Sequence, residues 1–109
     1  YSQAIEYNGI VYTSGVIGVN PATGEVGETI EEQTTQVFEN LKGLLADAGS
    51  SLVQAIRTTV FIKNMADCAK VNEIYATYLT GAFPARSSVE VARLPKDLLI
   101  EVEVTAIKG

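Results

Sequence analysis

The segment 83–107 alternates polar and apolar side chains at every second position, on both sides of a loop that contains Pro95. Because successive side chains of a β-strand point to opposite faces, this period predicts two strands, each with one apolar and one polar face. The polar positions are Arg86, Ser88, Glu90, Glu101, Glu103 and Thr105. The apolar faces need a covering layer. The polar faces place an arginine and several carboxylates in a row, and we expect Arg86 and Glu101 to lie on neighbouring strands of one subunit.

Two amphipathic segments predict the helices of the covering layer. The first helix begins at Thr29, whose hydroxyl forms a capping box with the carboxylate of Glu32, and it ends at Gly49. Its apolar side chains recur with a period of about 3.6 residues. They are Ile30, Val37, Leu41, Leu44, Leu45 and Ala48. On the opposite side we expect Gln33 and Thr34 to face water.

The second helix is predicted over about 65–79 because its apolar side chains have helical spacing and because Gly81 and Pro84 follow it. Cys68 belongs to its apolar stripe, so we expect the thiol in the core. Asn72 is expected at a polar surface position unless a ligand recruits it.

Shorter signals place the remaining strands. Asn8 and Gly9 tolerate positive φ and favour a tight hairpin turn between two short strands within 1–14. The range 16–19 continues as an extended segment, and the β-branched run 56–62 predicts a buried strand. The resulting order is β-β-β-α-β-α-β-β.

This order predicts one α+β domain over residues 1–109, with two helices packed on one face of a mostly antiparallel mixed sheet. The other face mixes charged and apolar side chains. A mixed face of this kind indicates burial against further copies of the same subunit.

The composition excludes several classes of function. The 109 residues carry a net charge of −5 without a run of Lys or Arg, so the basic footprint of a nucleic-acid-binding protein is missing. The sequence has no histidine and one cysteine, which excludes an intrachain disulfide and the usual zinc, haem and histidine-triad sites. No apolar run approaches about 18 residues, so no membrane span is expected. A lone cysteine fits a reducing compartment, so we expect a cytoplasmic protein and leave an organelle open.

Several short motifs resemble those of the Rid (reactive intermediate deaminase) family, also called the YjgF family. They are TSG at 13–15, NPATGE at 20–25, AGSSL at 48–52, TTVFIK at 58–63, VNEIYATY at 71–78 and FPARSSVEVARLPKD at 83–97. The resemblance covers essentially the whole chain, and the last motif is the most specific. Because this motif keeps its arginine, it is similar to the RidA branch.

The resemblance implies a chorismate-mutase-like fold and a homotrimer with three clefts between subunits. It also implies hydrolysis of reactive 2-enamino and 2-imino acids, such as 2-aminoacrylate, to 2-keto acids and ammonia, with neither cofactor nor metal. Arg86 matches the family's substrate-binding arginine, and Glu101 matches its water-binding acid. The other matched substrate-binding positions are Tyr1, Ser14, Gly15 and Asn72. Ser88 stands where many members have a cysteine, which argues for a hydroxyl contact in place of an essential thiol.

The chemistry of these residue types agrees with that activity. A guanidinium matches a carboxylate with two parallel charge-assisted hydrogen bonds, so Arg86 could hold a 2-imino acid beside its electrophilic carbon. Glu101 could accept a hydrogen bond from water and direct the oxygen at that carbon. The proton donor to the leaving nitrogen stays open between Glu101, a water molecule and the Tyr1 hydroxyl. We expect Tyr1 or Asn72 to reach a cleft from the neighbouring subunit.

Each assignment has a structural alternative. Arg86 could pair with Glu90, Glu101 or Glu103 across the sheet, because a buried arginine is costly unless it is paired. The pattern alone does not separate Glu101 from Glu103. Tyr1, near a chain end, would ordinarily be disordered.

Two other functions compete with the enzymatic one. Some relatives have been called translation inhibitors or ribonucleases, but the acidic balance and the missing histidines disfavour an RNA-directed protein. A trimer that binds 2-keto acids without turnover, as a sensor or a chaperone, would need the same arginine. Turnover is the observation that separates these possibilities.

Overall fold

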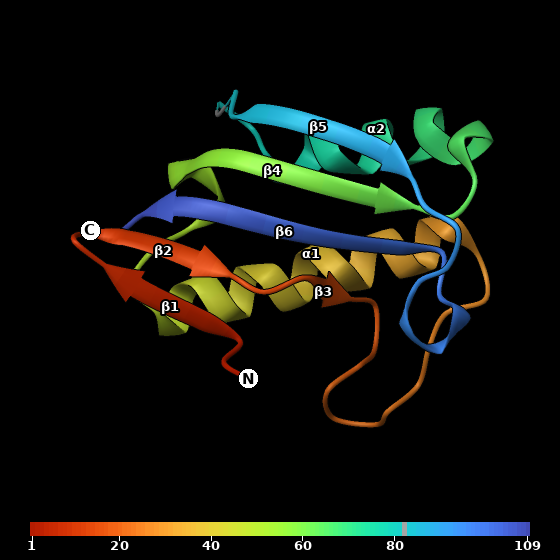
Figure 1. The fold of residues 1–109 in the computed structure, drawn as a ribbon, viewed down its shortest axis with the longest axis horizontal. Helices are drawn as coiled ribbons and strands as arrows, with labels where there is room; N and C mark the ends of the chain where they lie inside the picture. Colours follow the sequence, from red (N-terminus) through yellow and green to blue (C-terminus); the bar gives the residue numbers. More distant parts are fainter. Residues whose placement is uncertain (82) are drawn as a thin grey trace.

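A computed structural model describes residues 1–81 and 83–109 of the protein. Within these residues the chain forms two α-helices and a six-stranded sheet, and both helices cover the same face of the sheet (Figure 1). The strands are β1 (Ala4–Tyr7), β2 (Ile10–Thr13), β3 (Val16–Ile17), β4 (Ala55–Ile62), β5 (Ala85–Glu90) and β6 (Ile100–Ile107). The helices are α1 (Ile30–Asp47) and α2 (Cys68–Tyr78). The predicted element order and the two-layer α+β architecture are confirmed.

The sheet has the strand order β1-β2-β6-β4-β5, and β3 pairs with the remaining part of β6. All pairs are antiparallel except β4 with β5, which α2 connects as a crossover helix. The predicted hairpin joins β1 and β2, with Asn8 at φ 52° and Gly9 at φ 80°. Because β4 lies between β5 and β6, the expectation that Arg86 and Glu101 lie on neighbouring strands is wrong.

Helix α1 begins as the capping box predicts. The Thr29 side chain accepts a hydrogen bond from the Glu32 backbone N–H at 3.1 Å. The expectation that Gln33 and Thr34 face water is wrong, because both are buried. The Gln33 amide donates to the Gly27 carbonyl and accepts from the Leu99 N–H, and the Thr34 hydroxyl donates to the Ile30 carbonyl. These bonds allow two polar side chains to join the buried face of the helix.

The core lies between this face of α1, the facing side of α2 and the covered face of the sheet. Its largest fully buried side chains include Phe38, Leu41, Leu45, Ile62, Ile100 and Val102. The second helix was predicted to begin at about residue 65. Its α-helical part begins three residues later, at Cys68, because Met65–Asp67 form a 3₁₀ turn. Cys68, at the first turn of α2, is only partly buried and lies outside the core cluster, contrary to expectation. One turn later, Val71 fills the core position instead.

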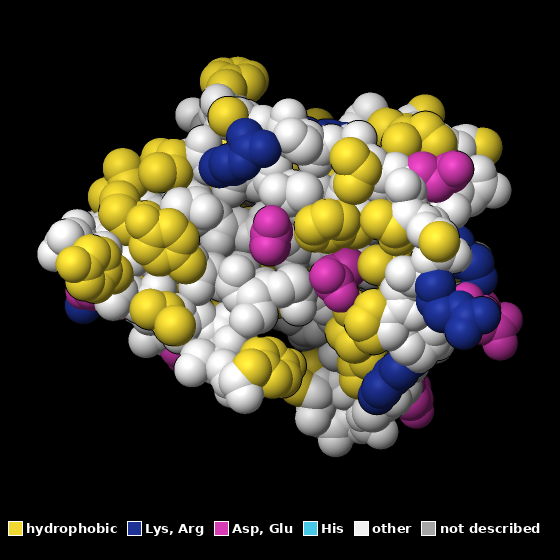
Figure 2. All heavy atoms as spheres, viewed as in Figure 1, with side chains coloured by type: hydrophobic (Ala, Val, Ile, Leu, Met, Phe, Trp, Pro, Cys, Tyr) yellow, Lys and Arg dark blue, Asp and Glu magenta, His cyan; other side chains and the backbone are white. Residues whose placement is uncertain are grey.

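Within residues 1–81 and 83–109, no helix lies over the other face of the sheet. Figure 2 shows this face, where hydrophobic side chains gather on either side of acidic side chains over the middle of the sheet. The strand register assigns Ile5, Tyr7, Tyr12, Val89, Ile107, Glu101 and Glu103 to it. Tyr7 is 66% exposed and Ile5 58% exposed. An apolar surface of this extent on a small domain is typical of an interface with another protein.

Candidate active site

Arg86 lies on the edge strand β5, on the face of the sheet that the helices cover. It is paired in the parallel register with Thr58 of β4, which is fully buried beneath α2. The Arg86 guanidinium carbon lies 4.5 Å from the centre of the Tyr75 ring, and Nε donates to the Ser88 hydroxyl at 2.7 Å. The guanidinium carbon therefore lies over an aromatic ring, and Nε is already bonded.

The structural alternative for Arg86 is contradicted. In the part of the chain that the structure describes, the ion pairs are Lys63–Asp97 and Lys108–Glu6, and neither involves Arg86. Arg86 thus has no carboxylate partner among these residues, and Glu90, Glu101 and Glu103 leave its charge uncompensated. A partly buried guanidinium without a counter-ion is suited to bind an anion from outside the subunit.

Glu101 lies near the start of β6, on the face of the sheet that no helix covers. It pairs with Phe61 of β4 and with Ile17 of β3, whereas the next residue, Val102, points into the core. Its carboxylate packs directly against Gly15, where a Cβ atom would lie 2.2 Å from Oε2. Gly15 therefore provides the space that the carboxylate occupies.

The pKa of Glu101 is raised above its ordinary value, first by burial and then by repulsion from the neighbouring Glu103 carboxylate. Both causes act against the ionised form. Glu103 lies two residues along the same strand, so the two carboxylates share one face. A carboxylate with a raised pKa is a stronger hydrogen-bond acceptor for water once it is ionised, and it keeps its proton to a higher pH than an ordinary glutamate.

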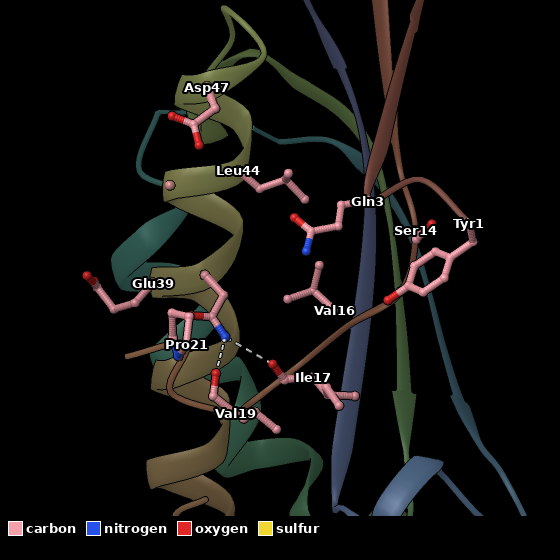
Figure 3. Close-up of a pocket in the computed structure, with 13 residues that line it drawn as sticks. Tyr1, Gln3, Ser14, Val16, Ile17, Val19, Pro21, Glu39, Leu44 and Asp47 are labelled. Carbon is pink, nitrogen blue, oxygen red and sulfur yellow. Dashed lines mark hydrogen bonds between the residues drawn. The ribbon is translucent and has the colours of Figure 1, made fainter. Parts of the chain in front are cut away.

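Ser14 and Gly15 interrupt the strand that runs beside β6. The interruption separates β2 from β3, and across it the Thr13 hydroxyl accepts the Val104 N–H at 2.9 Å in place of a backbone carbonyl. The Ser14 hydroxyl donates to the Ser2 carbonyl at 2.7 Å, which ties the first residues of the chain to this point. Tyr1 is fully exposed, and Figure 3 shows its ring beside Ser14.

An open pocket of about 480 Å³ adjoins this interruption. Figure 3 shows it between α1 and the segment that carries β3, with Tyr1 and Ser14 at one side and Glu39 at the other. Gly15 belongs both to the pocket lining and to the contact with Glu101. Gln3 and Asn40 also line the pocket, and no sequence pattern pointed to them.

Asn72 is exposed on α2, one turn before Tyr75. Its amide lies 3.9 Å from the Cys68 sulfur, so Cys68, Asn72 and Tyr75 follow one another along one side of the helix. This side of α2 leads toward the Arg86 guanidinium, because Tyr75 contacts it. Neither Tyr75 nor Thr58 was singled out from the sequence, and the spacing of three residues from Asn72 was the one signal for Tyr75.

The predicted site residues thus form two groups within a subunit. Arg86, Ser88 and the Asn72 side of α2 belong to the helix-covered face at the β5 edge, as the contacts through Tyr75 show. Glu101 and Gly15 lie together on the opposite, uncovered face, next to Tyr1 and Ser14. The expectation that Arg86 and Glu101 of one subunit serve the same cleft does not fit this arrangement, because the β4 register puts them on opposite faces of the sheet.

The described residues offer no cluster of three or more His, Cys, Asp or Glu side chains that could hold a metal ion. None of the helices within them is long and apolar enough to cross a membrane. The first group offers the Arg86 guanidinium, which can bind an anion. The second offers the Glu101 carboxylate, which can hydrogen-bond water.

Comparisons with known proteins agree on one family. The family model described as Endoribonuclease L-PSP matches residues 1–108. The 2-iminobutanoate/2-iminopropanoate deaminase of Salmonella typhimurium is 44% identical over 111 residues, covering 99% of this chain and 87% of that protein.

Solved structures give the same result. A Yersinia pestis protein of unknown function, of the conserved Rid protein family, superposes with a TM-score of 0.95 at 50% identity, covering 98% of this chain and 86% of that one. Escherichia coli TdcF with bound serine superposes with a TM-score of 0.94 at 38% identity, covering 100% and 88%. The family resemblance of the sequence is therefore confirmed. The chain belongs to the Rid family, whose family model is described as Endoribonuclease L-PSP.

Proposed function

We propose that the protein hydrolyses reactive 2-imino acids, and the enamino acids that tautomerise to them, to 2-keto acids and ammonia. The observation that carries this proposal is Arg86, a partly buried guanidinium held by Tyr75 and Ser88 without a carboxylate partner among the described residues. The name of the Salmonella typhimurium relative refers to 2-imino acids, and the serine bound to E. coli TdcF is a small amino acid that also carries a carboxylate.

Arg86 binds the substrate carboxylate. With Nε bonded to Ser88, the two terminal nitrogens remain to form a fork with the two carboxylate oxygens. The positive charge also draws electron density from the adjacent C=N carbon, which makes that carbon more open to attack. Lysine has no such fork, so it cannot orient the substrate in the same way.

Glu101 directs the attacking water. In its ionised form it accepts a hydrogen bond from water and takes up a proton as the oxygen adds to the C=N carbon. The nitrogen is protonated to give a carbinolamine. The carbinolamine then expels ammonia as the nitrogen takes another proton, from Glu101, from water or from the Tyr1 hydroxyl, while its own hydroxyl gives up a proton to Glu101 or water and becomes the keto oxygen. Free imines hydrolyse readily, so orientation and proton transfer of about 10²–10⁴-fold are sufficient.

A second copy of the chain brings the two groups together. Since Arg86 lies at the β5 edge and Glu101 on the uncovered face, the β5 edge of one subunit must meet the uncovered face of its neighbour. The exposed apolar side chains of that face supply the contact surface. A closed homotrimer then contains three equivalent clefts, each with Arg86 from one subunit and Glu101 from the next.

The direct test is keto-acid release in the presence of an imino acid that an amino-acid oxidase forms in situ. We expect the protein to accelerate release in proportion to its concentration. If the protein binds pyruvate but the rate of keto-acid release equals the rate without protein, a trimer that binds keto acids without turnover is favoured. Cleavage of RNA by protein of high purity, with no effect on imino acids, would favour the activity named in the family model.

The pH dependence of the reaction tests the role of Glu101. Because burial and Glu103 raise the Glu101 pKa, kcat/KM should fall on acidification through a midpoint above the ordinary glutamate value. Glu103→Gln removes the second of these causes, so the midpoint should move to lower pH. The check is kcat/KM for both proteins from about pH 4, near the ordinary glutamate pKa, to about pH 9. If the midpoint of the acid limb does not move in Glu103→Gln, the titrating group is not Glu101.

A further inference from the structure

Tyr75 contacts the candidate substrate-binding arginine through the face of its ring. The distance from the Arg86 guanidinium carbon to the ring centre is 4.5 Å, well within the range of a cation–π contact. Tyr75 lies in α2 and Arg86 in β5, so the crossover helix of the β4-α2-β5 unit presents the ring to the strand that follows it.

The Tyr75 ring is fixed from two further sides. Its hydroxyl and the Thr58 hydroxyl hydrogen-bond at 2.8 Å, and Thr58 is fully buried. The buried Phe38 ring meets Tyr75 edge-on, with 5.6 Å between ring centres and 88° between planes. Thr58 is also the register partner of Arg86, so the residue that bonds the Tyr75 hydroxyl lies beside the arginine that the ring contacts.

The Arg86 guanidinium is constrained in two ways as a result. The Tyr75 ring lies against the guanidinium carbon, and the bond from Nε to Ser88 at 2.7 Å limits rotation of the group. Within the described residues, the two terminal nitrogens remain free to bind a ligand. A carboxylate can therefore bind at the end of the guanidinium, on the side opposite Cδ.

We propose that Tyr75 is a positioning residue that holds the Arg86 fork in its carboxylate-binding orientation. This inference rests on the proposed role of Arg86 as the substrate clamp. Tyr75 acts through Arg86 and need not touch the substrate, so its loss should weaken carboxylate binding and leave the proton-transfer step unchanged.

The test compares Tyr75→Leu with Tyr75→Phe. Leucine keeps apolar volume but removes the ring, so the Kd for pyruvate and the KM for the imino acid should rise about 10-fold, with kcat within about twofold. Phenylalanine keeps the ring and loses only the Thr58 bond, so both constants should stay within about threefold of the wild-type values. Tyr75→Met, which fills irregular core space, repeats the leucine arm if that variant does not fold.

Tyr78→Leu is the matched control. Tyr78 lies in the same helix and stacks on Phe38, but it bonds Glu39 and not Arg86. Its loss should lower the melting temperature without changing the Kd for pyruvate. Folded Tyr75→Leu or Tyr75→Met protein with a wild-type Kd would overturn the inference. Because pyruvate binding needs no turnover, wild-type protein that binds pyruvate but does not hydrolyse imino acids would overturn only the proposed activity.

Discussion

Replacing Arg86 with alanine should lower kcat/KM for imino-acid hydrolysis by at least about 100-fold, because the variant loses a desolvated charge-assisted fork to the substrate carboxylate. Arg86→Lys should recover only a small part of this loss, since an ammonium cannot make the two parallel bonds. The measurement is keto-acid release over a range of imino-acid concentrations, which separates kcat from KM.

The fold should tolerate this substitution. Arg86 has no ion pair in the described part of the chain, so its loss leaves no buried counter-charge. The oligomeric state and the melting temperature should therefore stay close to wild-type values. Arg57→Ala is the control, because Arg57 is an exposed arginine on the adjacent strand and its side chain, among the described residues, bonds the Ser87 hydroxyl rather than Ser88 or Tyr75. Wild-type kcat/KM in folded Arg86→Ala protein would refute the clamp.

Replacing Gly15 with alanine should remove activity almost as completely while the protein stays folded. A methyl group at this position would lie 2.2 Å from Glu101 Oε2 and 2.6 Å from Cδ, so the carboxylate must move away. The displaced atoms belong to the end of a flexible side chain, so the move costs little stability. The attacking water then loses its orientation, and kcat should fall by about 100-fold.

Gly43→Ala is the matched control for this substitution. Gly43 lies inside α1 on the same pocket, and apart from its own helix backbone nothing among the described residues lies within 4 Å of an added Cβ, so the methyl group enters the pocket without touching Glu101. Alanine also favours helix by about 0.5–1 kcal/mol over glycine. The control should raise the melting temperature slightly and keep kcat. A Gly15→Ala variant with wild-type kcat would show that the position of the Glu101 carboxylate against Gly15 does not matter for turnover.

Much of the fold follows from local chemistry in the sequence. The Thr29 cap, the Asn8-Gly9 turn and the two helical periods each act over a few residues, and the structure confirms all of them. The buried state of Gln33 could not be read in the same way. Its amide is satisfied by Gly27 and Leu99, and Leu99 is 66 positions away, so no local pattern carries that information.

The arrangement of the candidate site was only partly accessible for a related reason. Alternation shows that a strand has two faces, but the pairing register decides which face meets the helices. The parallel pairing of β5 with β4 turns Arg86 toward α2, and the antiparallel pairing of β6 with β4 turns Glu101 away from it. The family resemblance supplied the residues, whereas the structure supplied their separation into two groups.

Mixing two inactive variants tests the assignment of these groups to different subunits. Arg86→Ala and Glu101→Gln are each expected to be inactive when assembled alone into the proposed trimer. If each cleft takes Arg86 from one subunit and Glu101 from the next, trimers refolded from a 1:1 mixture should regain about one quarter of wild-type activity, because about one cleft in four combines two intact residues. Activity in the mixture no greater than in the separate variants would contradict a site shared between subunits.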